Sequence, residues 1–454
     1  MADTTPALPA PPAPPSLREA SRFWLHLGLV SFGGPGGQIA LMHRELVDQR
    51  RWLSERRYLH ALNYCMVLPG PEAIQLATYL GWLMHGIRGG LVAGGLFLAP
   101  SVLVLLGLST LYALGAQLPL LSAVFWALKP AVLAIVLQAG WRVGRRTLHH
   151  PALVLVAAAA FLALSELKLP YPLIVTAAAL LGWAAGRWQP AWVRKPQAAH
   201  SGGAAPGTAP EQPAIHGDDT PTPPHARPSR RRLAALLLSW GLATLLPLAW
   251  LTAGFGAQGL LPTMARFFSR VALVSFGGAY AVLPYVAQAS VEQFGWLSAA
   301  QVVDGLALGE TTPGPLIMVL AFVGFMGGWN GGLFGPPGTW IGAAVAALVT
   351  VWFTFLPSFG FILCGAPLVE ASRDDLRLGG PLTAITAAVV GVILSLALFF
   401  ARPVLWPQGR FDGPALLLAL AALGLLLRAR WGVLPVIGAA ALVGLLRGLV
   451  LGAP

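Results

Sequence analysis

The chain repeats itself at a spacing of 244 residues. Residues 29–34 read LVSFGG and recur at 273–278, the tripeptide WLS at 52–54 recurs at 296–298, and the tripeptide PGP at 69–71 recurs at 313–315. Chance matches would not hold a single register without a gap, so the pattern indicates an internal duplication. Each copy places glycines and prolines inside apolar sequence, which is typical of secondary transporters built from repeats with broken helices.

Composition indicates whether this duplicated unit folds in water or in a lipid bilayer. Of 454 residues, 56% are hydrophobic and only 10% are charged, whereas soluble domains have roughly 25% charged residues. Uncharged runs of about twenty residues, such as 381–400, are long enough to cross a bilayer. We therefore predict an all-α polytopic membrane protein with two inverted-topology repeats and re-entrant helical hairpins.

Other function classes find little support. The net charge of +12 comes from arginines between hydrophobic runs, as the positive-inside rule produces, so we expect no nucleic-acid partner. Cys65 and Cys364 lie in or beside apolar segments and indicate no metal site. The residues 33–37 (GGPGG) do not form a phosphate-binding motif, and no nucleophile–base pair is evident. We expect neither an enzyme nor a cofactor.

The expected organisation is a disordered cytosolic tail (1–16), a first repeat (17–188), a disordered cytosolic linker (189–232) rich in Pro, Ala and His, an extra transmembrane helix (233–254) and a second repeat (255–454). Each repeat is expected to start with two hairpins, broken in the first copy at 33–37 and 69–71. Their arms of about 12–17 residues are short for a full span. The alternative, in which each arm crosses the membrane, stays open.

Charge tests the inversion of the second repeat. Four arginines flank the first WLS tripeptide, and none flanks the second. The positive-inside rule then places the first loop in the cytosol and the second outside. We expect a cytosolic N-terminus and an external C-terminus. The arginines are Arg50, Arg51, Arg56 and Arg57, and the equivalent residues are Phe294, Gly295, Ala300 and Gln301.

The hairpin tips are the first candidate site. A helix start presents free N–H groups and a positive dipole end, which favour an anion. We hypothesise that the four tips converge near the bilayer midplane and bind a small oxyanion; the alternative is that these residues only allow kinks and close packing. The tip residues are Ser31, Gly33, Gly34, Pro69, Gly70, Pro71, Ser275, Gly277, Gly278, Pro313, Gly314 and Pro315.

Ionisable residues at membrane depth are the second set of candidates. Lys129 lies mid-span, where it could pair with a carboxylate or a substrate anion, and its equivalent is Val390. Glu72 and Glu310 flank the two PGP tripeptides; Glu72 is either a proton-sensitive gate or a charge stabilised by the helix dipole. Arg44 and Glu45 are candidates for gating or for an ion pair. Polar neighbours of the tips complete the set: Asn63, Gln75, Thr311 and Thr312.

Several of these stretches resemble the chromate ion transporter family. They are 31–35 (SFGGP), 50–52 (RRW), 60–73, 75–79 and 94–97 in the first half, and 275–278 and 312–315 in the second. The resemblance implies a two-domain chromate transporter of the bacterial inner membrane that exports chromate and confers resistance. It also implies competition by sulfate, which has the same charge and shape. Whether the chain forms a homodimer stays open.

Energetics leaves the coupling open. A dianion leaving a negative-inside cell gains about 4.6 kcal/mol at 100 mV, so export needs no further energy source. Protonation of Glu72 beside the anion would favour binding, which suits co-transport with protons better than antiport. One alternative function is an uptake carrier for sulfate or another oxyanion. Another is an integral-membrane lipid-phosphate transferase that uses the arginines between 50 and 57.

Overall fold

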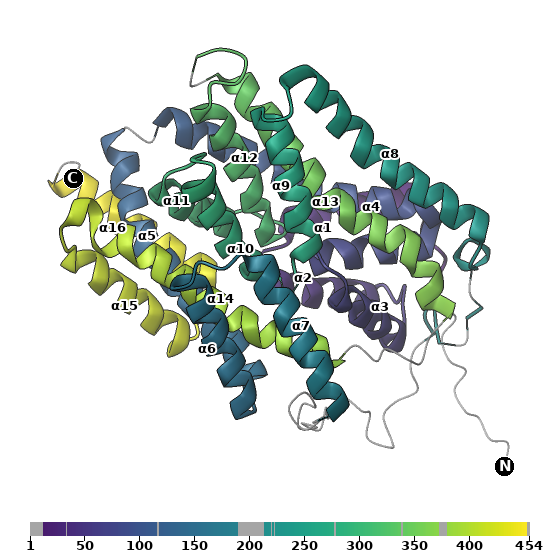
Figure 1. Ribbon diagram of the computed structural model, residues 1–454. Helices are drawn as coiled ribbons and strands as arrows, with labels where there is room; N and C mark the ends of the chain where they lie inside the picture. The colour runs from purple at the N-terminus through teal and green to yellow at the C-terminus, as the bar shows by residue number, and fades with distance from the viewer. Residues whose placement is uncertain are drawn as a thin grey trace.

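The computed structural model describes residues 12–32, 34–115, 118–188, 213–218, 220–221, 223–276, 278–336, 339–371 and 379–451 (Figure 1). Helices make up almost all of this part of the chain, as predicted. The first half holds α1 (Leu17–Val30), α2 (Gly34–His43), the π-helical turn η1 (Arg44–Gln49), α3 (Glu55–Val67), α4 (Glu72–Gly115), α5 (Pro119–Thr147), α6 (Pro151–Ser165) and α7 (Tyr171–Trp188).

The second half repeats this order after one additional helix, α8 (Arg230–Phe255). It consists of α9 (Leu260–Val274), α10 (Ala279–Gln288), the π-helical turn η4 (Ala289–Gln293), α11 (Ala299–Thr311), the short turn η5 (Leu316–Met318), α12 (Val319–Asn330), α13 (Trp340–Ala371), α14 (Gly379–Leu405), α15 (Gly413–Leu427) and α16 (Val433–Leu451). A 3₁₀ turn, η3 (Pro224–Ala226), precedes α8, and another, η6 (Pro407–Gly409), follows α14.

The duplication extends to individual hydrogen bonds. The amides of Trp52 and Leu53 both donate to the Leu46 carbonyl, and those of Trp296 and Leu297, 244 residues later, both donate to Ser290. Ser54 caps α3 and Ser298 caps α11, each accepting from the amide three residues on. Both halves even contain a π-helical turn at the same place. The two copies therefore share one local fold.

The two copies run in opposite directions through the molecule. α4 bends at Gly86 (φ +65°), and its straight part to residue 115 is about 45 Å long. Near the Gly86 end of α4, the Trp82 carbonyl oxygen lies 3.0 Å from the ring nitrogen of His225 in the linker. Near the other end, Thr110 accepts a hydrogen bond from the Trp340 indole. We call the end with residues 50–57, 82–86, 213–218 and 223–227 the linker face, and the end with residues 294–298, 330–336 and 406–412 the far face. The equivalent loops 50–54 and 294–298 thus lie on opposite faces.

The halves interlock, so the core belongs to both. α6 and α7 pack on α14 of the second half, and in return α15 and α16 pack on α5. The symmetric contacts are close, because a Cβ on Gly182 of α7 would lie 2.6 Å from the Gly380 carbonyl oxygen, and one on Gly444 of α16 would lie 2.6 Å from that of Ala123. α4 and α13 also pack against each other at the centre.

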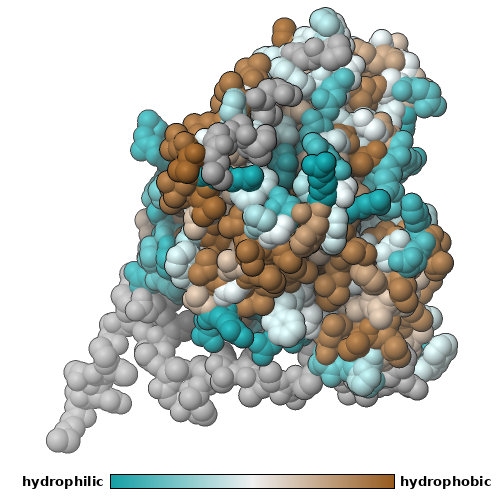
Figure 2. All heavy atoms as spheres, turned by 90° about the vertical axis from the view of Figure 1, so that its left-hand side faces the viewer, coloured by the Kyte–Doolittle hydropathy of each residue, from teal (hydrophilic) through white to brown (hydrophobic). Residues whose placement is uncertain are grey.

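The outer surface suits a membrane. Within the described ranges, six helices are long and apolar enough to cross one, and three shorter apolar helices accompany them. Figure 2 shows mostly hydrophobic side chains on the side formed by α5, α6, α15 and α16, interrupted by hydrophilic patches. Exposed leucines on these helices include Leu155, Leu417, Leu420, Leu442 and Leu446. The six long helices are Glu72–Gly115, Pro119–Thr147, Arg230–Phe255, Trp340–Pro367, Gly380–Leu405 and Val433–Val450.

The described part of the linker differs from the prediction of disorder over 189–232. The described residues of this segment (213–218, 220–221 and 223–229), which we call the strap, pack on the first repeat. His216 forms a β-bridge with Leu53, and the Ser54 hydroxyl donates to Asp218 at 2.6 Å. The buried Arg57 donates to the Thr220 carbonyl at 2.8 Å. The composition of this segment cannot build a core, and polar partners on the first repeat hold it in place instead. The extra helix, α8, starts at Arg230 instead of the predicted residue 233.

We predict that the strap loosens in acid. Burial, and then the positive charge of Arg57, lower the pKa of His216 to about 4, whereas an unfolded histidine has a pKa of about 6.5. The released strap binds the proton more readily, so the stability from His216 is complete above about pH 6.5 and is lost as the pH falls toward 4. A nitroxide at Ala214→Cys, with Cys65 and Cys364 replaced by alanine, should gain mobility over this range. In His216→Gln the mobility should not depend on pH, and equal titration of both proteins would contradict the assignment.

Candidate functional site

The broken segments of the two halves meet at the centre and bond to each other. The Gly70 amide donates to the Ser275 carbonyl at 2.7 Å, and the Gly314 amide donates to the Ser31 carbonyl at 2.6 Å. Each bond joins the PGP tripeptide of one half to the SFGG break of the other. The tips therefore converge, and their role in binding a ligand remains a prediction.

Only glycine fits at the two crossing points. Gly70 has a φ of +123° and Gly314 of +98°, in a region that side-chain-bearing residues rarely adopt. A Cβ on Gly314 would lie 1.7 Å from the Ser101 hydroxyl oxygen, and one on Gly70 would lie 2.5 Å from that of Ser358. Ser101 is in α4 and Ser358 in α13, so each long central helix braces the tip of the other half.

The crossing revises the predicted anion site. The amides of Gly70 and Gly314 already have carbonyl partners, so they are not free to hold an anion. The free groups are the hydroxyls of Ser31 and Ser275, which are buried and have no hydrogen-bond partner among the described residues. Gln75 is also buried; its amide nitrogen donates to Pro69 at 2.7 Å, and its side-chain oxygen has no such partner. Buried polar groups in this condition call for an explanation, such as a ligand.

The other predicted tip residues divide into three groups. The hydroxyls of Thr311 and Thr312 donate to carbonyls of their own helix, both at 2.8 Å, and Asn63 is exposed on α3. Of these three residues, Thr312 lies beside the crossing, where it lines a cavity. A second group acts through the backbone. Gly34 and Gly278 have positive φ angles (+72° and +90°) where the chain turns, and the Pro313 carbonyl accepts a hydrogen bond from Ser101. Pro71 and Pro315 belong to the same turns. Gly33 and Gly277 lie outside the described residues.

A cavity of about 250 Å³, the tip cavity, adjoins the crossing. Glu310 lines it and accepts a hydrogen bond from the Tyr280 hydroxyl. Glu72, at the start of α4, does not line this cavity, so the two carboxylates occupy inequivalent places. The lining residues are Phe32, Gly34, Gly309, Glu310, Thr312, Gly314, Leu316 and residues 432–435.

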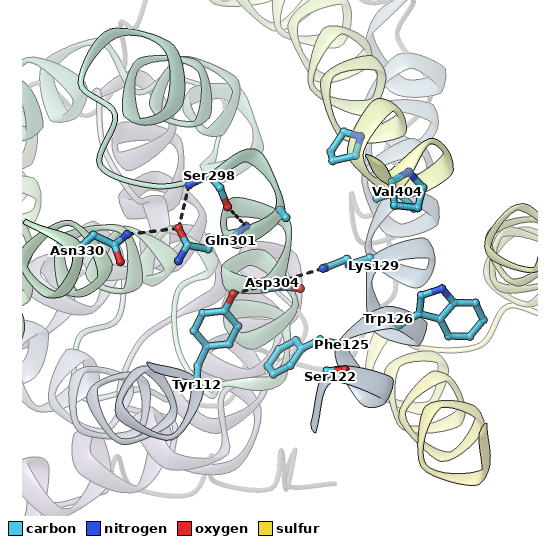
Figure 3. Close-up of a pocket in the computed structure, with 13 residues that line it drawn as sticks. Tyr112, Ser122, Phe125, Trp126, Lys129, Ser298, Gln301, Asp304, Asn330 and Val404 are labelled. Atoms are coloured by element: carbon cyan, nitrogen blue, oxygen red, sulfur yellow. Dashed lines mark hydrogen bonds and ion pairs between the residues drawn. The ribbon is translucent and has the colours of Figure 1, made fainter. Parts of the chain in front are cut away.

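A larger cavity of about 550 Å³, the far-face cavity, contains an ion pair (Figure 3). Lys129 of α5 places its amine 3.5 Å from Asp304 Oδ2, and the Tyr112 hydroxyl donates to the same oxygen at 3.0 Å. Asp304 is almost completely buried, while a quarter of the Lys129 side chain is exposed. Neutral polar groups share the cavity: Ser122, Ser298, Gln301 and Asn330. Of the two partners predicted for Lys129, the structure supplies the carboxylate.

Asp304 and Tyr112 are the residues that the sequence analysis missed. The sequence did contain a signal for Asp304. Like Lys129, it is an ionisable residue inside an apolar segment, which is unusual in a membrane protein. At the 244-residue spacing, Asp304 corresponds to His60, whose ring nitrogen lies 3.4 Å from the Val369 carbonyl oxygen. The counterpart of Lys129, Val390, is a buried apolar residue in α14. The ion pair, which joins α5 of the first half to α11 of the second, therefore has no symmetric equivalent.

Arg44 and Glu45 lie apart from both cavities. They are in η1 on the linker face, with a distance of 3.8 Å between Arg44 Nη2 and Glu45 Oε1. Glu45 also lies 3.7 Å from Arg50 Nε, and the Arg44 side chain is 60% exposed. The geometry is that of a local surface ion pair, one of the two roles considered for these residues.

Comparison with known proteins adds an independent observation. The family model described as chromate transporter matches residues 18–183 and 262–445. The chromate transport protein of Pseudomonas aeruginosa is 32% identical over 403 residues, covering 86% of this chain and 82% of that protein. The one from Cupriavidus metallidurans is 28% identical over 435 residues, covering 95% and 93%. A probable chromate transport protein of Synechococcus elongatus is 28% identical over 412 residues, covering 90% and 89%. No solved structure matches the chain.

Proposed function

The chain belongs to the chromate transporter family, and from this premise we propose that it is a secondary transporter that exports chromate across the bacterial inner membrane and confers chromate resistance. Chromate transport is what the family is named for, and the apolar helices make the chain a multi-pass membrane protein. Direction, resistance, competition by sulfate and coupling to protons belong to the proposal.

The crossing of the tips is the observation that carries it. Each half closes its broken segment with a hydrogen bond from the other half. A tilt of one half against the other must therefore change the hydrogen bonds at the crossing. A binding site formed by these residues would stay near the centre of the molecule during such a tilt. The unpaired hydroxyls of Ser31 and Ser275 offer neutral donors to the oxygens of a tetrahedral anion. Alternating access of this centre to the two faces is the mechanism we propose.

Charge orients the molecule. The linker face carries Arg50, Arg51, Arg56 and Arg57, and the equivalent positions on the far face carry no charge. The positive-inside rule makes the linker face cytosolic, which puts the N-terminus inside, the C-terminus outside and the far-face cavity toward the exterior. Arg266, Arg402 and Arg410, which this orientation places toward the exterior, are exceptions. A reporter that is active only in the cytosol, fused after Pro454, should be silent; activity there would contradict this orientation.

The lipid-phosphate transferase is less favoured. Its proposed basic rim is occupied, since Arg57 is buried against the strap and Arg50 lies beside Glu45. Sulfate uptake would use the same architecture in the opposite direction. The membrane potential opposes it, because moving a dianion into a negative-inside cell costs about 4.6 kcal/mol at 100 mV.

The direct cellular test is chromate accumulation. Cells of a chromate-sensitive bacterial host that express the chain should accumulate less chromate and tolerate more of it than cells with an empty vector. Excess external sulfate should not reverse the effect, because export draws on the cytosolic pool. Higher chromate accumulation on expression would overturn export and favour the uptake carrier.

We also predict a moderate effect at the tip cavity. Tyr280→Phe removes the hydroxyl that donates to the partly buried Glu310. The loss of this one hydrogen bond, about 1 kcal/mol, corresponds to about fivefold slower chromate transport. The matched control is Tyr285→Phe on the same helix, whose ring stacks on Tyr171; its rate should stay within about twofold. Equal rates for the two variants would remove Glu310 from the mechanism.

A further inference from the structure

The far-face cavity holds one positive and one negative side chain against each other. Among the described residues that line it, Lys129 and Asp304 are the charged ones, and Tyr112 is the other titratable one. Lys129 comes from α5, Tyr112 from α4 and Asp304 from α11, so three helices meet at this pair. Behind the lining residue Trp126 lie Arg447, which stacks on its ring, and Asp412, which accepts from its indole. With both ions of the Lys129–Asp304 pair formed, their charges cancel, so the pair itself has little attraction for an anion.

The two ions differ in how firmly they are held. Asp304 is 5% exposed in its side chain, and its Oδ1 is buried without a hydrogen-bond partner in the described structure. Lys129 is 25% exposed, and its amine points across the cavity toward Asp304 (Figure 3). An anion that enters the cavity can reach the lysine amine. The Asp304 carboxylate would then lose its cation, and leaving a buried charge without a partner costs free energy. Binding of a dianion to Lys129 is therefore opposed by Asp304 unless Asp304 takes up a proton.

We propose that Asp304 and the transported dianion alternate as the partner of Lys129, so that a proton on Asp304 accompanies the anion in the far-face cavity. The inference rests on the proposed function, because it assigns a coupling residue to the same transport cycle. When Asp304 loses its proton, the Lys129–Asp304 pair forms again and expels the anion. The Tyr112 hydroxyl, which donates to Asp304 Oδ2 at 3.0 Å, positions the carboxylate for this return.

The asymmetry between the halves confines the exchange to one face of the molecule. The symmetry-related positions are His60 in α3 of the first half and Val390 in α14 of the second, and His60 faces a backbone carbonyl. A pair that can displace the anion thus exists near the far face and has no equivalent at the symmetric place near the linker face. In the proposed orientation, expulsion by Asp304 acts where an exporter releases its cargo.

Equilibrium binding to the purified full-length protein in detergent tests the exchange. The probes are radiolabelled sulfate and chromate, measured at about pH 6 and about pH 8, which bracket neutrality. The variants are Asp304→Asn and, as a matched control, Glu292→Gln, which removes an exposed carboxylate on the same face outside the cavity. Chromate itself takes up protons in this range, so each comparison is made between proteins at one pH.

We expect Asp304→Asn to bind the dianion at least tenfold more tightly than the unmodified protein at the higher pH. Sulfate remains a dianion at both pH values, so its binding to Asp304→Asn should also lose most of the pH dependence. Glu292→Gln should change the affinity less than twofold. A gain in affinity cannot come from misfolding, so it separates the exchange from a purely structural ion pair. Chromate binding with Asp304→Asn unchanged or weaker would overturn the inference and spare the proposed function. Tighter binding of sulfate with no chromate binding would overturn the proposed substrate and keep the inference, and no binding of either dianion would overturn both.

Discussion

Gly314→Ala should abolish chromate transport, with a fall of at least about a hundredfold. Alanine at a φ of +98° is strained, and its Cβ would lie 1.7 Å from the Ser101 hydroxyl oxygen. Strain at such a position and a displaced buried helix together cost about 3–5 kcal/mol. The crossing bond from the Gly314 amide to Ser31 would be lost with the shift. Transport in vesicles and the thermal midpoint in detergent are the measurements.

The matched control for this substitution is Gly107→Ala. Gly107 lies in α4, two turns beyond Ser101, with ordinary helical backbone and open space where a Cβ would be. Alanine is the better helix former by about 1 kcal/mol, so transport should be unchanged and stability equal or higher. Full transport by Gly314→Ala would show that the crossing is not needed for the transport cycle.

Lys129→Gln should have the second-largest effect. It leaves Asp304 buried without its cation, and breaking a buried pair in this way typically costs about 3–5 kcal/mol. It also removes the cation that we expect the dianion to meet. Chromate transport should fall by about a hundredfold or more, and the thermal midpoint should drop.

The double variant Lys129→Gln/Asp304→Asn separates these two losses. Removing both charges should restore most of the thermal stability, because no buried ion is left unpaired. Transport should stay low, because the cation that meets the dianion is missing. Lys168→Gln, at the other described lysine, which is exposed, is the control and should leave both quantities unchanged. Recovery of transport in the double variant would reduce Lys129 to a structural partner of Asp304.

Much of the fold follows from the 244-residue spacing. The spacing predicts equivalent hairpins, and the structure repeats the hydrogen bonds around Trp52 at Trp296. The breaks at Ser31 and Ser275 could be predicted because glycine and proline in apolar sequence interrupt a helix. The inverted arrangement could also be predicted, since an extra helix between two equal halves reverses the second.

The partners across the halves could not be predicted. Tyr112 and Asp304 are 192 residues apart in sequence, and the bond from Gly314 to Ser31 likewise depends on how the two halves dock. For the same reason the sequence could not reveal that the amides at the tips are already paired. The strap was missed because its composition lacks a core of its own, whereas its order comes from Ser54, Arg57 and Trp82 of the first repeat.

Chromate accumulation in everted membrane vesicles tests the central claim most directly, namely that the crossed tips of two inverted halves carry a tetrahedral dianion out of the cell. Vesicles with the unmodified protein, energised to be positive inside, should take up chromate, excess external sulfate should inhibit the uptake, and vesicles with Gly314→Ala should not accumulate it. Absence of chromate uptake there, together with sulfate uptake into right-side-out vesicles, would contradict export and make the protein an importer of another oxyanion.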